Sequence, residues 1–258
     1  MKKVRSRAPL RLGLAGGGTD LSPYFDEHTG YVLNTTIDRY AYCSISSRED
    51  KQVTFTTTDR NSSETLSIDE YPFALKGDLM LLKVAYNKII TDYNNGVPLP
   101  LKIITFCDSP VGSRLGTSSS LMVSIIKAFE EYLSIGFDDY QIALLAFDIE
   151  RIDCKLDCGR QVQYSATFGG FNFMEFYSQE KALVNSLRVR NWIRCELESL
   201  ILVHYTGKSR SSAAVISDQV KSFTDKKFSS LENMHQIKES AILMKEAILR
   251  GDIVILCV

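Results

Sequence analysis

Several features are missing or sparse in this sequence of 258 residues. It has no apolar run of the roughly 18 residues that a membrane-spanning helix needs. Its basic opening segment is interrupted by Arg11 and by glycines before it forms the apolar core of a signal peptide. The formal net charge is -1 and the pI is about 6.3, so no basic excess indicates binding to nucleic acid or to an anionic membrane. These absences predict a cytoplasmic protein that binds neither nucleic acid nor membrane.

Metal-binding patterns of cysteine and histidine are also sparse. The six cysteines are scattered, and only Cys154 and Cys158 lie close together, with no second pair or histidine nearby. Structural zinc sites use four ligands and shorter spacings. The three histidines, His28, His204 and His235, are far apart. The sequence therefore predicts reduced, mostly buried thiols and no zinc site.

The chain has an ordinary composition for a folded domain, with 45% hydrophobic and 24% charged residues. β-Branched and aromatic clusters predict strands, and apolar residues at helical spacing predict helices. The predicted strands are 3–14, 31–47, 51–58, 64–68, 101–108, 167–177 and 199–206. The predicted helices are 78–95, 118–134, 138–153 and two stretches within 211–250. The pattern is α+β, with a strand-rich first third.

A glycine- and serine-rich segment, SPVGSRLGTSSS, joins the predicted strand 101–108 to the predicted helix 118–134. Backbone N–H groups at a helix N-terminus lack partners within the helix, and the helix dipole there favours negative charge. Gly112 and Gly116 permit backbone conformations closed to other residues and a close approach of phosphate. Hydroxyls from Thr117 onward can cap the helix, contact phosphate or bind magnesium. The segment is a candidate phosphate-binding loop, and a polar loop before an N-capped helix is the alternative.

The order of residues in this segment restricts the class of nucleotide site. The segment lacks the Gly-Lys-Ser/Thr ending of the Walker loop. Neither this segment nor AGGGTD at 15–20 has the glycine spacing of a dinucleotide-binding fingerprint. The sequence therefore predicts nucleotide phosphate binding on a different scaffold.

Three separated motifs resemble the GHMP kinase superfamily, which includes galactokinase, homoserine kinase, mevalonate kinase and phosphomevalonate kinase. They are APLRLGLAGGGTDLSPYF, SPVGSRLGTSSS and FGGFNFMEF. The phosphate loop of the family reads Pro-x-Gly-Ser-Gly-Leu-Gly-Ser-Ser-Ser, and residues 110–119 match nine of these ten positions if threonine is accepted at 117. The nucleotide-binding residues implied by this resemblance are Pro110, Gly112, Ser113, Arg114, Leu115, Gly116, Thr117, Ser118, Ser119 and Ser120.

The resemblance also implies a fold, a cofactor and a metal. The implied fold is α+β, with a ribosomal-S5-like N-terminal domain at 1–185 and part of a ferredoxin-like C-terminal domain at 186–258. The implied cofactors are ATP and Mg²⁺, with Ser118 and Glu150 as metal ligands. One hydroxyl and one carboxylate, completed by phosphate oxygens and water, suit the octahedral shell of magnesium. Without the resemblance, the favoured interpretation of Glu150 is a surface helix residue paired with a neighbouring basic side chain.

Within the superfamily, PLRLGLAGGGTD resembles the branch that phosphorylates the anomeric oxygen of D-glycero-D-manno-heptose 7-phosphate, toward nucleotide-activated heptose and surface polysaccharide. Other members usually carry Glu-His where this sequence has Gly17-Gly18. The implied substrate-binding residues are Arg11, Gly17, Gly18, Thr19 and Asp20. Arg11 either meets the distal phosphate of the sugar or lies on the solvent face of a strand. Asp20 has a structural alternative, as a residue that closes a loop or caps a helix.

Two residues depart from the family pattern. The catalytic aspartate of the family would lie twelve residues after Glu150, in Gly-x-Gln-Asp-Gln-Tyr, but the sequence here is GRQVQY and the position is Val162. Valine can neither orient nor deprotonate the attacking hydroxyl, and general-base catalysis is typically worth roughly a hundred- to ten-thousand-fold in rate. Arg114 replaces the loop glycine, so a positive φ there would be strained, unless its guanidinium instead reaches over the triphosphate.

Three functional hypotheses follow from these motifs and departures. The first is an ATP-dependent heptose-phosphate kinase, favoured by Asp20, Ser118 and Glu150. The second is a non-catalytic relative that retains nucleotide or sugar binding, or a remnant without function, favoured by Val162, Arg114 and the missing third glycine-rich motif of the family. The third is a kinase of another sugar, such as fucose. The third glycine-rich motif of the family would lie beyond residue 258, and the ending DIVILCV does not resemble the family's continuation, so a shifted reading frame or shortened gene is a further expectation.

Overall fold

The computed structural model describes residues 2–110, 112–179, 181–205 and 228–252. The chain forms two compact units that are interleaved along the sequence. The first unit contains residues 1–10, 38–110 and 116–156, and the second contains 11–37, 111–115 and 157–258. The expected domain boundary near residue 185 stays a prediction.

The first unit is built on a sheet. In it, β2 (Gly30–Ser47) pairs antiparallel with β5 (Leu101–Cys107), from Ala41 opposite Cys107 to Ser47 opposite Leu101. Strand β5 pairs parallel with β3 (Gln52–Thr57), and β3 pairs antiparallel with β4 (Ser62–Ser67). Along β5, buried and less buried residues alternate because successive side chains of a strand point to opposite faces. One face of this sheet therefore carries the core.

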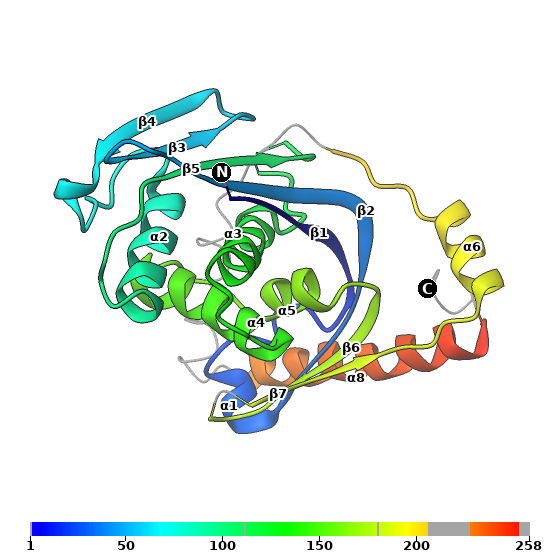
Figure 1. The fold of residues 1–258 in the computed structure, drawn as a ribbon. Helices are drawn as coiled ribbons and strands as arrows, with labels where there is room; N and C mark the ends of the chain where they lie inside the picture. The colour runs from blue at the N-terminus through cyan, green and yellow to red at the C-terminus, as the bar shows by residue number, and fades with distance from the viewer. Residues whose placement is uncertain (1, 111, 180, 206–227, 253–258) are drawn as a thin grey trace. The chain divides into compact units, whose positions relative to one another are not determined.

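Three helices cover that face of the first unit (Figure 1). They are α2 (Met80–Tyr93), α3 (Thr117–Leu133) and α4 (Asp139–Asp148), and a π-helical turn, Ile149–Asp153, follows α4. Helix α4 begins with a capping box, in which the carboxylate of Asp138 accepts from the backbone N–H of Gln141 at 2.8 Å. Aromatic rings fill the space between sheet and helices, including edge-to-face contacts of Tyr86 with Phe55 and Phe129.

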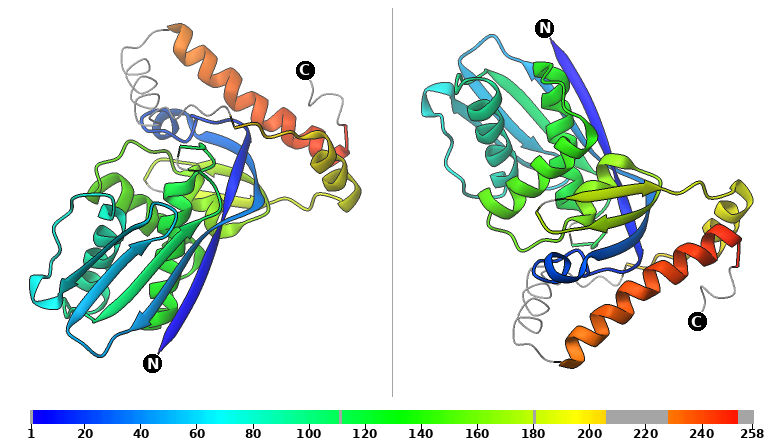
Figure 2. Two further views of the ribbon diagram at one scale, coloured as in Figure 1. Left: turned by 90° about the horizontal axis from the view of Figure 1, so that it is seen from above. Right: turned by 90° about the horizontal axis from the view of Figure 1, so that it is seen from below.

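The second unit contains residues 11–15 of β1 and residues 30–37 of β2. Residues 30–35 of β2 pair antiparallel with β6 (Phe171–Phe176), and β6 continues into a hairpin with β7 (Ala182–Ser186). Strand β1 (Lys3–Ala15) pairs with β2. The helices of this unit are α1 (Tyr24–His28), α5 (Gln161–Phe168), α6 (Asn191–Leu200) and the long α8 (Phe228–Arg250) (Figure 2). Strands β2 and β6 and helices α6 and α8 share a core that contains Leu33, Phe173, Ile193, Leu197, Ala241 and Ile248.

Most predicted elements are confirmed, and the α+β class with them, but two boundaries changed. The strand predicted at 167–177 begins only at Phe171, because α5 runs to Phe168 and the positive φ angles of Gly169 and Gly170 (67° and 78°) end the helix. The helix predicted at 138–153 is α-helical to Asp148 and π-helical beyond it.

The strand predicted at 199–206 is wrong for the residues that the structure describes. Helix α6 extends to Leu200, and 201–205 follow it without strand structure. The apolar run that indicated a buried strand is exposed, with Leu202 at 90%. Of the two helices expected within 211–250, the second is α8, and the first, before residue 224, lies outside the described residues.

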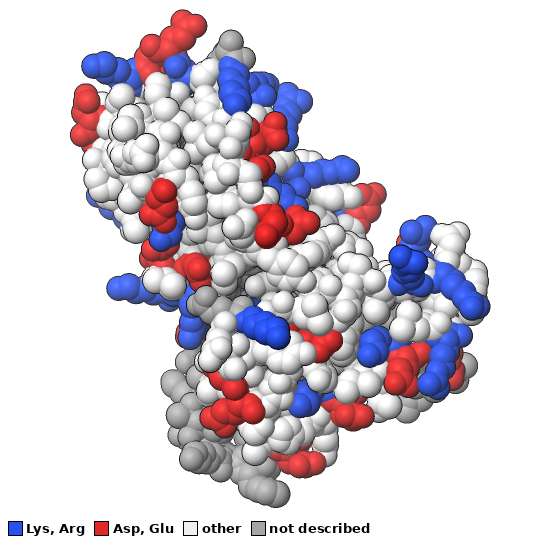
Figure 3. Space-filling model, turned by 60° about the horizontal axis from the view of Figure 1, so that its bottom comes forward, with Lys and Arg blue, Asp and Glu red and all other residues white. Residues whose placement is uncertain are grey.

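The surface agrees with the near-neutral charge of the sequence. On the face seen in Figure 3, basic and acidic side chains are interspersed, and no broad field of one sign covers it. Within the described ranges, no helix is long and apolar enough to cross a membrane.

Candidate functional site

The candidate phosphate loop joins β5 to α3 in an unusual backbone conformation. Gly112, Arg114 and Gly116 have φ angles of 79°, 62° and 82°. This left-handed region is open to glycine and strained for residues with a Cβ. The predicted strain at Arg114 is therefore confirmed, and its side chain is exposed.

The first turn of α3 begins without a capping side chain. Its N-cap is Gly116, which has no side chain to accept from the first backbone N–H groups of the helix. Ser118 is exposed there, whereas Ser120 is fully buried and donates its hydroxyl to the carbonyl of Pro9 at 3.0 Å. The serine run thus divides between an outward residue and one that anchors the helix to β1.

Glu150 lies inside the first unit rather than on its surface. It is 2% exposed in the π-helical turn after α4, which excludes the surface interpretation. Burial, and then the negative charge of Glu150, raise the pKa of the Cys154 thiol to about 11. A buried carboxylate needs compensation by a positive group or by hydrogen bonds. Ser118 belongs to the same unit, and the ligand roles of both residues stay proposals.

The glycine turn after β1 is held by Thr19, which is fully buried. The Thr19 hydroxyl lies 2.8 Å from the carbonyl oxygens of Gly16 and Tyr31 and accepts the N–H of Tyr31 at 3.0 Å. Gly16 has a φ of 78°, and a Cβ there would lie 1.9 Å from the Tyr31 carbonyl oxygen. Thr19 therefore fixes the turn against β2 by its hydroxyl, while Gly17 is exposed.

Asp20 is 1% exposed and is surrounded by donors. Its Oδ1 accepts from the backbone N–H of Gly18 at 3.2 Å and from Nε2 of Gln161 at 3.1 Å. Its Oδ2 accepts from the backbone N–H of Gln161 at 2.9 Å. Asp20 thus closes its own turn and also caps the first turn of α5, a helix far away in the sequence. A Cβ on Gly159 would lie 2.2 Å from Oδ2, so this carboxylate requires glycine there.

Arg11 lies beside this turn and the phosphate loop. Its backbone N–H donates to the carbonyl of Leu115 at 3.2 Å, and Nη1 donates to the carbonyl of Arg114 at 3.4 Å. Burial lowers the pKa of Arg11, and the nearby charge of Asp20 opposes that shift. Its Nε is buried without a hydrogen-bond partner, as is the hydroxyl of Ser113. Arg11 as a whole is half-buried, so both of its interpretations stay open. Two buried donor atoms without partners, its Nε and the Ser113 hydroxyl, are what an oxygen-rich ligand would satisfy.

Two neighbouring residues of α5 complete the region. Val162 is half-buried on the first turn and has no group that accepts a proton. Gln161 was missed as a site residue by the sequence reasoning. Its only signal was its place directly before Val162 in GRQVQY.

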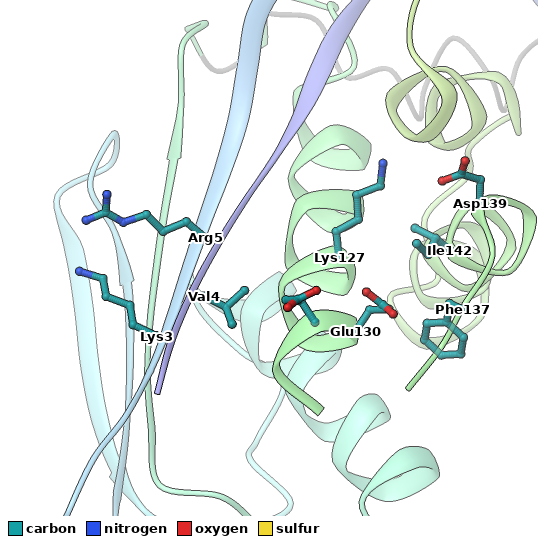
Figure 4. Close-up of a pocket in the computed structure, with 9 residues that line it drawn as sticks. Lys3, Val4, Arg5, Lys127, Glu130, Phe137, Asp139 and Ile142 are labelled. Atoms are coloured by element: carbon teal, nitrogen blue, oxygen red, sulfur yellow. The ribbon is translucent and has the colours of Figure 1, made fainter. Parts of the chain in front are cut away.

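A separate pocket of about 640 Å³ lies in the first unit, between β1, α3 and α4 (Figure 4). Its charged lining mixes both signs and contains none of the predicted site residues. Burial lowers the pKa of Lys127 in this lining, and Asp139 opposes the shift. The lining residues are Lys3, Val4, Arg5, Lys127, Glu130, Glu131, Phe137, Asp139 and Ile142.

The chain is similar to known sugar kinases. The family description "GHMP kinases N terminal domain" matches residues 80–170. D-glycero-alpha-D-manno-heptose 7-phosphate kinase of Campylobacter jejuni is 46% identical over 252 residues, which cover 98% of this chain and 73% of that protein. The crystal structure of a D-glycero-D-manno-heptose 1-phosphate kinase from Bacteriodes thetaiotaomicron has a TM-score of 0.85 at 42% identity, covering 97% of this chain and 74% of the other. Lactococcus lactis galactokinase is similar in fold alone, with a TM-score of 0.67 at 14% identity over 98% of this chain and 71% of the other. The fold expected from the resemblance is confirmed.

Proposed function

The chain belongs to the GHMP kinase family, and from that premise we propose that it binds ATP and a heptose phosphate and transfers a phosphoryl group to the sugar. The single observation that carries the proposal is the 46% identity, along 98% of this chain, with a heptose 7-phosphate kinase. The acceptor we propose is the anomeric oxygen of D-glycero-D-manno-heptose 7-phosphate.

The phosphates of ATP would lie against the loop from Pro110 to Ser119. The left-handed φ angles of Gly112 and Gly116, the uncapped first turn of α3 and the unpartnered hydroxyl of Ser113 support this assignment. We propose Ser118 and Glu150 as the residues that hold Mg²⁺, which neutralises phosphate charge when it is bound. Because the Ser120 hydroxyl donates to the Pro9 carbonyl in β1, we propose a structural role for Ser120 instead.

The sugar phosphate would lie against the glycine turn. Asp20 and the Thr19 hydroxyl are engaged inside the fold, so we propose that they hold the turn in shape. Direct contacts then come from the exposed backbone of Gly17, from Gly18 and from Arg11. The buried, unpartnered Nε of Arg11 supports a contact with an anionic oxygen of the substrate.

Val162 supports an alternative function, a relative that binds both ligands and turns them over slowly or not at all. Phosphoryl transfer depends on positioning and on stabilisation of charge, and neither requires a general base. The missing carboxylate removes a contribution of roughly a hundred- to ten-thousand-fold. We therefore propose a kinase whose catalysis rests on positioning.

The experiment that tests the function follows product formation by phosphorus NMR with Mg²⁺-ATP and D-glycero-D-manno-heptose 7-phosphate. The chain itself, Val162→Asp and the matched control Val162→Asn are compared. We expect slow turnover by the chain and a roughly hundred-fold or larger increase in Val162→Asp alone. Binding of both ligands without turnover in any of the three would support the alternative, and turnover only with L-fucose or galactose would replace heptose as the substrate.

We also propose a cytoplasmic location. ATP is supplied there, and reducing conditions keep thiols free. The buried thiols of Cys43 and Cys107 are free in the structure, and burial raises the pKa of both. Fractionation of the native host's cells would check the location.

A further inference from the structure

We propose that Gln161 binds the substrate directly, and that its carboxamide oxygen accepts a hydrogen bond from a sugar hydroxyl. Asp20 does not contact the sugar in this proposal; it orients the Gln161 amide by accepting a hydrogen bond from its Nε2. The inference rests on the proposed sugar-kinase function and adds to it a residue that determines which hydroxyl pattern is bound.

The orientation of the Gln161 amide follows from its neighbour. An ionised carboxylate accepts hydrogen bonds and cannot donate them. The amide end that faces Oδ1 of Asp20, 3.1 Å away, must therefore be Nε2. This contact places Oε1 on the opposite side of the amide, and no described residue donates a hydrogen bond to Oε1.

Gly13, which has no side chain, borders the Oε1 atom of Gln161. A Cβ added to Gly13 would lie 3.6 Å from Oε1 of Gln161 and 3.9 Å from Nη1 of Arg11. These are ordinary contact distances, and the φ of Gly13 is not positive, so neither packing nor backbone conformation requires glycine there. The same holds for Gly17, whose added Cβ would meet only Nε2 of Gln161, at 3.9 Å. Both glycines are exposed.

Gly13 lies inside β1, where a glycine weakens the strand and often marks a place where a ligand approaches the backbone closely. Gly13 and Gly17 both have room for a Cβ, unlike Gly16 and Gly159, where an added Cβ would lie 1.9 Å and 2.2 Å from neighbouring oxygens. The two glycines that the fold does not need both border the Gln161 amide. The space above them is therefore available to a ligand.

The chemistry of this surface suits a polyol. Nη1 of Arg11 is a donor and Oε1 of Gln161 is an acceptor, and both border the position of Gly13. A sugar hydroxyl donates and accepts at the same time, so neighbouring hydroxyls can satisfy both groups. A purely anionic ligand would satisfy Arg11 and leave Oε1 facing another acceptor.

The cap of α5 does not depend on the Gln161 side chain. Asp20 would still accept from the backbone N–H groups of Gly18 and residue 161 in any variant at this position. Gln161→Met, which has similar length and no amide, is therefore expected to fold. This separates a loss of binding from a loss of structure.

The experiment is a calorimetric titration of the full chain with D-glycero-D-manno-heptose 7-phosphate, in the presence of Mg²⁺ and a non-hydrolysable ATP analogue. The variants are Gln161→Met and Gly13→Ala, and the matched control is Gln236→Met on the exposed side of α8. We expect the dissociation constant to rise roughly 3- to 10-fold in Gln161→Met, the range of one lost neutral hydrogen bond. In Gly13→Ala we expect weaker sugar binding together with an equal or higher Tm. A purely structural role would not separate binding from Tm in this way.

The outcomes distinguish this inference from the proposed function. If the chain binds heptose 7-phosphate and both variants bind it equally well, the role of Gln161 is overturned while the function stands. If the chain binds only L-fucose or galactose and Gln161→Met weakens that binding, the inference stands and the substrate changes. If the chain binds no sugar of this set, both are overturned.

Discussion

Replacing Arg114 with glycine should raise the stability of the protein. Arg114 has a φ of 62°, in the left-handed region, where a residue with a Cβ is strained by roughly 1–2 kcal/mol. Glycine removes that strain but adds freedom to the unfolded chain, which offsets about 0.4–1 kcal/mol. The side chain is exposed, and no hydrogen bond or ion pair of it occurs within the described part of the chain. The net gain therefore lies between about 0 and 1.6 kcal/mol and centres at ~0.8 kcal/mol, which corresponds to a rise in Tm of roughly 2–3 °C for a chain of this size.

The assay is thermal unfolding followed by circular dichroism, with Arg114→Ala as the matched control. Alanine removes the guanidinium but keeps the Cβ, so it should leave Tm close to that of the original chain. An equal rise in both variants would show that the side chain, and not the backbone, is the source of the effect. A lower Tm in Arg114→Gly would refute the strain argument. Titration with Mg²⁺-ATP tests the alternative role, because a guanidinium that reaches the triphosphate would weaken binding when it is removed.

Two further predictions concern the second unit. Gly159→Ala places a Cβ 2.2 Å from the buried carboxylate of Asp20, so the carboxylate or the start of α5 must move. In urea unfolding, the free energy of unfolding should fall by about 1–3 kcal/mol. The control Gly13→Ala should leave the free energy of unfolding unchanged. Burial, followed by neighbouring basic side chains, lowers the pKa of His235 below its ordinary 6.5. The unfolded chain then takes up this proton more readily than the folded chain, so the contribution to stability is present above pH 6.5 and is lost as the pH falls below it. The difference between the Tm at pH 7.5 and the Tm at pH 5.5 should be smaller in His235→Gln than in the original chain. An equal difference in the two proteins would show that His235 is not the source of this pH dependence.

Individual helices, strands and turn conformations were predictable from the sequence because they depend mainly on residues close together in the chain. The helix expected at 78–95 appears as Met80–Tyr93, and the strand expected at 101–108 as Leu101–Cys107. The strain at Arg114 followed from the position of one residue in a glycine pattern. Apolar content alone was a poorer guide, because the apolar run at 199–206 belongs to no strand over its described residues and is largely exposed.

The candidate site was predictable in outline and not in its contacts. The sequence pointed to Asp20 and Arg11 but left their roles open between ligand binding and structure. In the fold, Asp20 caps a helix that begins 141 residues later, through two hydrogen bonds to Gln161. No local pattern links those two residues, so Gln161 was not recognised. The surface interpretation of Glu150 failed for the same reason, since its burial depends on how α4 and the turn after it pack.

By itself, the sequence determined the order of strand, glycine loop and helix around residues 101–134, the family that this order and the glycine turn indicate, and the absence of a carboxylate at Val162. Each of these depends on residue type and spacing along the chain. Only the tertiary structure decided that Asp20 is used within the fold, that the Nε of Arg11 is buried without a partner, and that Gln161 directs its amide oxygen toward a glycine the fold does not need. Burial and hydrogen-bond partners depend on segments far apart in the sequence, and only packing brings those segments together.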